Sequence, residues 1–514
     1  MLLAITTSMR ARRAREWVGD RADQIPVLTA ILLALAVMLL VNAGKSITLD
    51  ESITLERTTP PLGRALRDLF VESQKPPVYF LLVYGLRRFF PSLEAVRLFS
   101  AATILGLFFV MHRVSKQLDL ATGWRSPVIL AAATPALLWA GAEARFYALT
   151  ALLLCISTGF FVRLWVLDTD RPVRDGIWFV VINYLALLTF YYSAFVIAGQ
   201  LAAAMASRRW KRWFAAGVGL VALMLPWAAL IISQASMYSR APVDAPRGVE
   251  AGSLGGSLYL LGRGAIWTVF RDPPVIHRPA LLVGITVIVV AIVAGAYALP
   301  DRRRTVKDWQ LVILATLPVA ALWVMRVANR FRVEDRHWMI LAPALILLLA
   351  SLAARIRIRA LRDVLWIALL AAFGVCAISF ARNDRGPRDY RTAVRLLMDR
   401  EHPGEPILFY WTNPLPFRYY YSGPNTLLPL HPGRAPDGGV FVPAEEQRAL
   451  RATIAGLGAR GAFWVFEESN RIESSKLVLP GTLGYPLHLV SEAQATGLRL
   501  LRFEPPAPSR EGTP

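Results

Sequence analysis

The chain has 514 residues, of which 55% are hydrophobic and 18% charged, and its formal net charge is +21. Soluble domains carry ~25% charged residues, whereas here the apolar residues form long blocks and the mean hydropathy is +0.44, which excludes an ordinary soluble enzyme. All but six of the 57 basic residues are arginine, and they stand between apolar segments. This distribution indicates charged loops of a membrane protein rather than a basic face for nucleic acid.

The apolar blocks predict an all-α polytopic membrane domain over residues 26–380, preceded by a cytoplasmic segment over 1–25. A bilayer-spanning helix needs ~20 apolar residues. About eleven segments meet this length closely enough to predict transmembrane helices: 26–44, 94–112, 126–141, 146–167, 176–190, 192–206, 213–233, 279–299, 309–327, 338–354 and 363–380.

Basic loops set the expected orientation. Arg10, Arg12, Arg13 and Arg15 precede the first span, which places the N-terminus in the cytoplasm. Later basic loops fall on the same side only if residues 77–90 do not cross the membrane. Only ten residues of that segment precede Arg87, so it is too short to span and predicts a juxtamembrane helix. The outer side then carries the loops 45–93 and 234–278 and the tail 381–514.

The tail 381–514 differs from the membrane domain, because its apolar segments are short. Short apolar segments at 406–412, 461–468 and 498–504 alternate with helical patterns at 388–401 and 444–460. This alternation predicts a small extracytoplasmic α/β domain. The last ten residues, rich in Pro, Ser and Gly, predict a disordered end.

An acidic pair, Asp50 and Glu51, follows the first predicted span. Partial burial at a membrane surface tunes a carboxylate for proton transfer, so the pair fits a general base or a metal ligand. The alternative is a solvated loop start, helped by Ser52 and Thr54.

Lys75 stands between Gln74 and two prolines at the start of the juxtamembrane helix. The prolines favour a helix start, and a helix N-terminus attracts anions. The pattern suits a phosphate at headgroup level, with a snorkelling lysine as the alternative.

Glu143 and Arg145 lie at an outer junction between two spans, within a nearly unbroken apolar stretch over 126–167. Ionisable side chains at such depth are functional candidates, and arginine binds phosphate through two N–H groups. The alternative is a structural ion pair at a turn.

The turn 329–337 mixes both signs of charge, and Arg330, Arg332 and Arg336 lie outside against the usual topology. They indicate phosphate or sugar ligands, or else snorkelling side chains. Arg336 and His337 open the next span and are the stronger candidates.

Two further outer features are less specific. Tyr191 and Tyr192 fit an aromatic belt as well as a sugar platform. The loop 234–278 is long enough to fold over a site as a lid. The sequence contains no Walker A, HExxH or CxxC motif, which argues against a nucleotide-driven pump.

In this order, the acidic pair, the Lys-Pro-Pro helix, the Glu-Ala-Arg-Phe-Tyr junction and the late Arg-His resemble the GT-C glycosyltransferases. The most similar branch contains the protein mannosyltransferases, the lipid A aminoarabinose transferase and the rhizobial lipopolysaccharide glycosyltransferases. The resemblance extends over roughly residues 26–355 and is strongest in PALLWAGAEARFYAL, residues 135–149.

The resemblance implies transfer of a sugar, with inversion, from a polyprenyl-phosphate donor to a lipid, glycan or protein acceptor. It implies that Asp50 is the general base and Glu51 its companion. The remaining implied site consists of Lys75, Arg145 and Arg336 for the donor phosphate and Glu143, Tyr147, Tyr192 and His337 for the substrate. Gln74 replaces a metal-binding residue of several relatives, so no metal ligand is assigned and a divalent metal stays open.

A transporter or flippase of lipid-linked glycans is the alternative function, because it would use the same arginines. Transporters show internal repeats and broken midplane helices, and neither is recognisable here. A non-catalytic scaffold is the third reading. The expected location is the bacterial inner membrane, with the N-terminus cytoplasmic, the tail periplasmic or extracellular, membrane lipids as neighbours and no nucleic-acid partner.

Overall fold

The computed structural model describes residues 24–67, 69–70, 76–120, 123–207, 209–229, 232, 254–270, 306–327, 334–354, 356, 358–383, 388–410, 413–430, 461–468 and 488–504. The chain forms two compact units. Met1–Asn42 and Arg57–Arg382 make up the first, here called the helical unit, and Ala43–Glu56 and Asn383–Pro514 make up the second, here called the sheet unit.

Six helices in the described residues are long and apolar enough to cross a membrane. They are Gln24–Gly44, Leu93–Gln117, Tyr147–Leu167, Trp309–Val327, Arg336–Ala354 and Arg359–Arg382. The expectation of a multi-pass, all-α membrane domain is confirmed.

Other predicted spans are shorter or broken. Residues 126–141 form two helices, α6 (Pro127–Ala133) and α7 (Pro135–Gly141), because Pro135 cannot donate the N–H that would continue α6 and starts a new helix instead. Three more predicted spans form α9 (Pro172–Leu187), α10 (Ser193–Met205) and α11 (Trp210–Met224), each shorter than 18 residues. The predicted span 279–299 lies outside the described residues.

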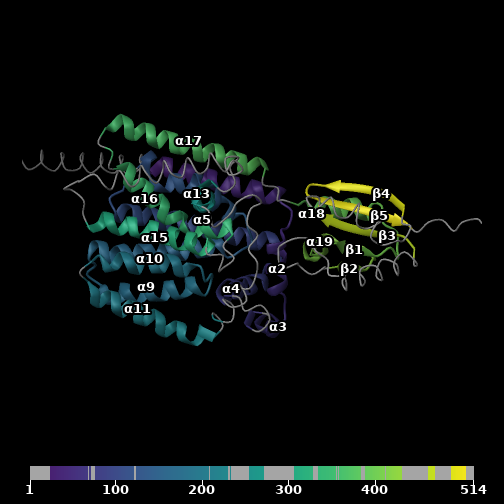
Figure 1. Ribbon diagram of the computed structural model, residues 1–514, viewed down its shortest axis with the longest axis horizontal. Helices are drawn as coiled ribbons and strands as arrows, with labels where there is room; N and C mark the ends of the chain where they lie inside the picture. Colours follow the sequence, from purple (N-terminus) through teal and green to yellow (C-terminus); the bar gives the residue numbers. More distant parts are fainter. Residues whose placement is uncertain are drawn as a thin grey trace, which may run out of the picture. The chain divides into compact units, whose positions relative to one another are not determined.

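The helical unit is built from helices packed lengthwise. In Figure 1, α9, α10 and α15 (Val306–Val327) run side by side, with α3 (Leu62–Arg67) and α4 (Pro77–Arg87) at one end of the bundle. A close approach joins α10 to α15, because a Cβ at Gly199 would lie 2.7 Å from the Pro318 ring. Helices α5 (Leu93–Gln117), α8 (Tyr147–Phe161) and α16 (Ala342–Ala354) form its interior.

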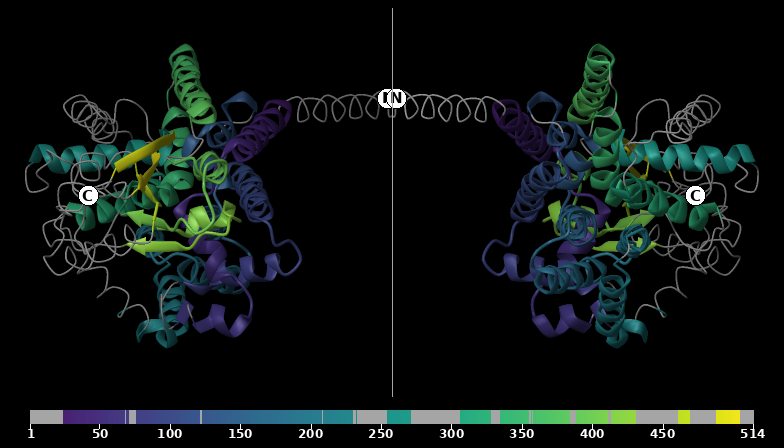
Figure 2. Two further views of the ribbon diagram at one scale, coloured as in Figure 1. Left: turned by 90° about the vertical axis from the view of Figure 1, so that its right-hand side faces the viewer. Right: turned by 90° about the vertical axis from the view of Figure 1, so that its left-hand side faces the viewer.

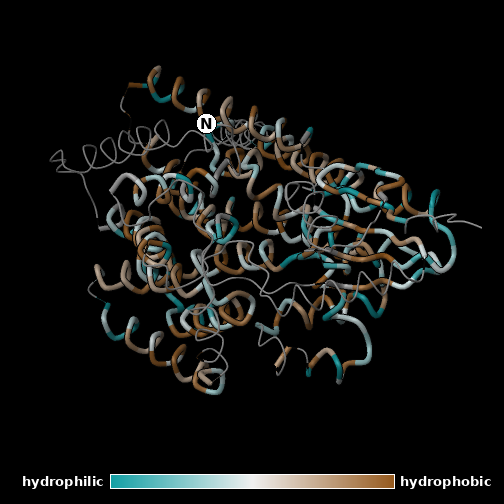
Figure 3. Tube along the Cα trace, turned by 45° about the vertical axis from the view of Figure 1, so that its right-hand side comes forward, coloured by the Kyte–Doolittle hydropathy of each residue, from teal (hydrophilic) through white to brown (hydrophobic). Residues whose placement is uncertain are grey.

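At the periphery, α17 (Arg359–Asn383) stands apart from the other helices of this unit (Figure 2). Only 22% of the most apolar 18-residue stretch of α17 is buried, and Val375 is 67% exposed. Hydrophobic stretches run along the helices in Figure 3. Apolar side chains on the outside of a bundle are the expected surface toward lipid.

The sheet unit contains a five-stranded sheet in the order β2-β1-β3-β5-β4. Its strands are β1 (Ile407–Tyr410), β2 (Leu427–Leu430), β3 (Phe463–Glu468), β4 (His488–Ala495) and β5 (Leu498–Glu504). Strands β1, β2 and β3 are parallel, with Ile407 opposite Leu427 and Trp464, whereas β5 runs antiparallel to β3 and β4. The predicted α/β character is confirmed.

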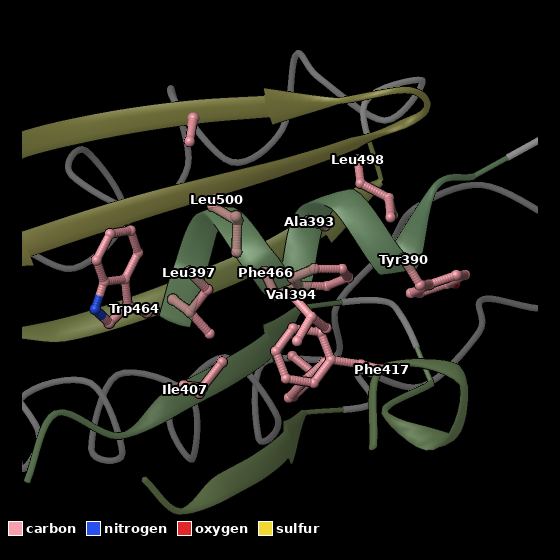
Figure 4. Packing of buried hydrophobic residues seen from close by; sticks show 12 residues of the cluster. Tyr390, Ala393, Val394, Leu397, Ile407, Phe417, Trp464, Phe466, Leu498 and Leu500 are labelled. Carbon is pink, nitrogen blue, oxygen red and sulfur yellow. The ribbon is translucent and has the colours of Figure 1, made fainter. Parts of the chain in front are cut away.

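Helix α18 (Tyr390–Met398) and the short α19 (Leu415–Tyr420) pack on this sheet. Figure 4 shows Tyr390, Phe417 and Phe466 in the shared core. The three strands and the 388–401 helix expected from the sequence are present as β1, β3, β5 and α18. The predicted helix 444–460 and the disordered end lie outside the described residues.

Charged side chains are also buried in the sheet unit. Glu405 accepts a hydrogen bond from Trp464 Nε1 at 2.7 Å and from Arg502 Nε at 3.2 Å. Burial by itself raises the pKa of Glu405, but the hydrogen bonds from Arg502 and Trp464 and the charge of Arg502 outweigh it. The pKa of Glu405 therefore lies below its ordinary value, and the carboxylate stays ionised within the domain.

One expectation is wrong. The segment 234–278 is not a loop throughout, because Leu254–Phe270 forms helix α13. Its early Gly255 and Gly256 lower helix propensity and indicated a loop. Burial of Tyr259, Leu260 and Trp267 favours the helix instead.

Candidate active site

The acidic pair begins α2 (Leu49–Arg57) in the sheet unit. Thr48 N donates to Glu51 Oε2 at 3.0 Å, and Glu51 N donates to Thr48 Oγ1 at 3.3 Å. This reciprocal arrangement is a capping box, which satisfies amides at the helix start. Glu51 is fully buried. Its carboxylate therefore fixes the first turn of α2.

Asp50 occupies that first turn and is only half-buried. Its carbonyl oxygen accepts a hydrogen bond from Thr54 Oγ1 at 3.0 Å. A carboxylate near a helix N-terminus is stabilised by the helix dipole. The two neighbouring carboxylates thus differ in environment, with Glu51 enclosed by the cap and Asp50 partly accessible.

The segment expected to form a juxtamembrane helix forms α4, which starts at Pro77 as the two prolines predicted. Its 11 residues are too few to span a membrane. Val78 N donates to Leu188 O at 3.0 Å, and Tyr79 is buried. The start of α4 is therefore held against the end of α9. Lys75 itself lies outside the described residues.

The predicted junction between two spans separates α7, ending at Gly141, from α8, starting at Tyr147. Glu143 is 5% exposed, and Arg145 is half-buried. The Arg145 guanidinium lies 4.9 Å from the centre of the Phe146 ring, within cation–π range. Both candidate charges are thus placed at a turn within the helical unit.

Four separate segments meet in one aromatic cluster around Phe190. The ring of Phe190 lies 4.7 Å from Phe146, 5.1 Å from Tyr192 and 5.4 Å from His337. Tyr192 stacks on His337 at 4.8 Å. This aromatic cluster consists of Tyr79, Phe146, Tyr147, Phe190, Tyr192 and His337.

This cluster joins the start of α4, the 143–147 junction, the 190–192 turn and η6 (Asp335–Leu341). Tyr147, Tyr192 and His337 were predicted from the sequence, whereas Tyr79 and Phe190 were not. Both missed residues neighbour a predicted motif, but aromatic residues are too common in membrane segments to be distinguished by position alone.

His337 and Arg336 have different surroundings although they are adjacent. Glu334 N donates to His337 Nδ1 at 3.1 Å, so the imidazole accepts at this nitrogen. Arg336 forms an ion pair with Glu334. Arg330 and Arg332 lie outside the described residues. His337 therefore belongs to the aromatic cluster, whereas Arg336 already has an acidic partner.

Helix α13 extends the cluster. Trp267 lies edge-on to Trp139 at 5.4 Å, and Trp139 lies 5.1 Å from Tyr147. Gly264 lies so close to Trp338 that a Cβ at residue 264 would come within 2.3 Å of the indole. The segment expected to act as a lid thus contributes a helix to this part of the helical unit.

Two buried cations are not part of any motif recognised in the sequence. Lys45 in the sheet unit and Arg97 in the helical unit are each 1% exposed. Arg97 Nη1 donates to the carbonyl of Asn42 at 3.5 Å. A single charge near the end of an apolar run is the sequence signal for such residues.

No protein-family model matches the sequence, and no curated protein matches it. Among solved structures, ArnT from Cupriavidus metallidurans bound to undecaprenyl phosphate has a TM-score of 0.56 and 11% identity, covering 93% of this chain and 98% of that chain. Apo ArnT has a TM-score of 0.54 and 12% identity, covering 95% and 98%. The chain has a GT-C fold.

A third structure, the arabinofuranosyltransferase AftD from mycobacteria, has a TM-score of 0.48 and 17% identity, covering 95% of this chain and 42% of that chain. The GT-C fold expected from the order of the motifs is confirmed by the two ArnT structures.

The described side chains offer a carboxylate, a guanidinium and aromatic faces, which suit proton transfer, phosphate binding and sugar stacking. Within the described ranges, no three His, Cys, Asp or Glu side chains are grouped so that they could hold a metal ion.

Proposed function

We propose that this protein is a membrane glycosyltransferase that moves a sugar from a polyprenyl-phosphate donor to an extracytoplasmic acceptor. The observation that carries the proposal is the aromatic cluster, in which four motifs from distant parts of the sequence meet beside Arg145. The GT-C fold shared with ArnT, one structure of which holds undecaprenyl phosphate, supports a lipid-linked donor.

Asp50 is the proposed general base. It takes the proton from the acceptor hydroxyl as that oxygen attacks the anomeric carbon. The bond from the anomeric carbon to the phosphate oxygen breaks, and polyprenyl phosphate leaves as an anion. Attack from the opposite face inverts the anomeric centre. Glu51, which holds the cap of α2, keeps Asp50 in place.

The proposed phosphate ligands are Lys75, Arg145 and Arg336, which stabilise the charge that develops on the leaving group. Arg336 would have to exchange its ion pair with Glu334 for the phosphate.

Glu143, Tyr147, Tyr192 and His337 are the proposed substrate-binding residues. Flat aromatic faces pack against the apolar face of a sugar ring, while the phenol and imidazole offer hydrogen bonds. The stacked Tyr192 and His337 rings provide such a surface within the aromatic cluster.

We place the protein in the bacterial inner membrane, with residues 1–25 cytoplasmic and the tail 381–514 periplasmic. The alternating basic loops support this topology. The acceptor is a lipid, glycan or protein that this outer side can reach.

The test uses purified protein in nanodiscs with a panel of undecaprenyl-phosphate hexoses and pentoses. Release of undecaprenyl phosphate with an outer-membrane lipid or glycan fraction as acceptor is the expected result. In proteoliposomes, movement of a fluorescent lipid-linked glycan across the bilayer without sugar transfer would instead identify a flippase and overturn the proposal.

A further inference from the structure

The segment that carries Asp50 belongs to the sheet unit, although it directly follows the first span. Ala43–Glu56 forms one compact unit with Asn383–Pro514. Ser46 and Ile47 are 3% and 1% exposed, so this part of the segment is buried. The tail domain is therefore packed together with the segment that carries Asp50.

Two hydrogen bonds connect this segment to the tail helices. Ile47 N donates to the Tyr420 hydroxyl at 2.9 Å. Arg391 N donates to Ser46 Oγ at 3.3 Å. The Arg391 guanidinium lies 5.6 Å from the centre of the Tyr420 ring. Two adjacent residues of the segment are thus bound by the ends of two different helices.

Both helix ends are fixed in turn by the core of the sheet unit. Phe417 packs at 4.9 Å from Phe466 on β3, three residues before Tyr420 on α19. Tyr390 stacks on Phe466 at 6.0 Å, one residue before Arg391 on α18. Figure 4 shows these rings together. The position of Tyr420 and of the Arg391 amide is therefore set by a packed, fully buried ring.

The anchor lies immediately before the helix cap. Ile47 precedes Thr48, whose amide and hydroxyl form the capping box with Glu51. Asp50 lies in the first turn that this box closes. A small displacement of Ile47 therefore changes where α2 starts and where its first carboxylate lies.

We infer that the tail domain positions Asp50, and that Tyr420 is the positioning residue through its hydrogen bond to the Ile47 amide. This inference rests on the proposed function of Asp50. Tyr420 has no contact with substrate in this role. It acts through the backbone of residues 46–48, and its loss lowers turnover because small misplacements of a catalytic group are costly.

The experiment compares Tyr420→Phe with Tyr421→Phe in full-length protein in nanodiscs. Each change removes one hydroxyl from adjacent tyrosines of the same domain. The Tyr421 hydroxyl donates to Glu401 Oε2 at 2.8 Å and accepts from Asn425 N at 2.9 Å, within the tail domain itself. Tyr421→Phe therefore controls for general loss of a hydrogen bond in the sheet unit.

The first readout is amide hydrogen exchange in peptides covering residues 44–56. Tyr420→Phe is expected to speed exchange there about twofold to tenfold, the range for loss of one hydrogen bond, whereas Tyr421→Phe leaves it unchanged. The second readout is release of undecaprenyl phosphate from an undecaprenyl-phosphate sugar. Tyr420→Phe is expected to lower kcat at least fivefold with an unchanged donor KM.

Unchanged exchange in Tyr420→Phe would overturn the inference, and so would faster exchange with an unchanged kcat. If the parent enzyme releases no undecaprenyl phosphate but Tyr420→Phe still exchanges faster, the anchor stands and the proposed function fails. The two proposals can therefore be separated.

Discussion

The helical unit and the sheet unit bury polar side chains in different ways. In the helical unit, Ser157 Oγ lies 2.8 Å from both Asn183 Oδ1 and Gln200 Oε1, and all three neutral side chains are fully buried. In the sheet unit, Arg499 and Glu467 form an ion pair with side chains 3% and 4% exposed. The buried network around Ser157 is thus neutral, whereas Arg499 and Glu467 form a buried charged pair.

The free-energy cost of burying a charge explains why the two units differ in their buried polar side chains. A charge at membrane depth is expensive, so neutral amides and hydroxyls join α8, α9 and α10. A charge in the sheet unit can keep a partner and several donors, as Glu405 does. Ionisable residues of the helical unit such as Glu143, Arg145 and His337 lie at turns or helix starts.

The largest expected effect separates the chemical roles of the two units. Asp50→Asn should lower turnover by about 10²- to 10⁴-fold, the contribution of a general base, while binding of undecaprenyl phosphate stays within about twofold of the parent. Arg145→Gln should weaken that binding instead. Native mass spectrometry and product release measure the two quantities. Equal loss of binding in both variants would contradict the division of roles.

The second effect concerns the charged interior of the sheet unit. Glu405→Gln should cost about 1.5–3 kcal/mol of local stability, because it weakens charge-assisted hydrogen bonds. Since the pKa of Glu405 is lowered in the folded protein, its stabilisation is present above about pH 4.3, the ordinary pKa of glutamate, and is lost as pH falls through the lowered pKa.

Hydrogen exchange of peptides from β3 and β5 between pH 6 and pH 3, corrected for intrinsic rates, measures this dependence. Glu504→Gln is the matched control, because Glu504 also binds Arg502 but its side chain is 41% exposed. A parent and a Glu405→Gln variant with the same pH profile would rule out the role of Glu405.

The third effect concerns close packing in the helical unit. Gly264→Ala should destabilise α13 by about 1–3 kcal/mol, because the added Cβ overlaps Trp338. Gly106→Ala on α5 is the control, since its Cβ would meet Leu152 at an ordinary 3.6 Å. Thermal unfolding in nanodiscs and protease sensitivity of α13 measure the change. Equal stability of the two variants would refute close packing at Gly264.

The smallest expected effect is on the neutral network. Ser157→Ala should cost about 0.6 kcal/mol, the average for a hydrogen bond between transmembrane helices. Thr158 lies on the same helix, and its hydroxyl donates a hydrogen bond to the backbone carbonyl of Leu154. Thr158→Ala therefore serves as the comparison. Thermal unfolding measures both. A cost above about 2 kcal/mol for Ser157→Ala would remove the contrast between the two units.

Hydrophobic periodicity was sufficient to predict a multi-pass helical membrane domain, because burial in lipid leaves a strong compositional signal. Strands β1, β3 and β5 were predictable for a similar reason, being apolar and central. Strand β2 was not, because Pro429 stands in it and only an edge strand tolerates a proline. Helix α13 was not predicted, because its glycines lower the helix propensity of the segment. Tertiary packing stabilises the helix instead.

For the candidate site, residue types and order predicted Tyr147, Tyr192 and His337, which lie in the aromatic cluster, but not the contacts that join them. The sequence Thr48-Leu49-Asp50-Glu51 has the capping-box pattern, which distinguishes the two carboxylates. Phe190 and Tyr420 could not be found in this way, because their roles depend on rings and backbone brought together by the fold.

The bond between Ile47 and Tyr420 joins positions 373 residues apart. At about 5–20 residues per second of synthesis, Ile47 and Tyr420 leave the ribosome about 20–75 s apart. The Asp50 helix is translated early but acquires its anchor late. An incomplete chain in the membrane would consequently carry the proposed base without its anchor, so on this proposal activity would begin only after the tail domain has folded.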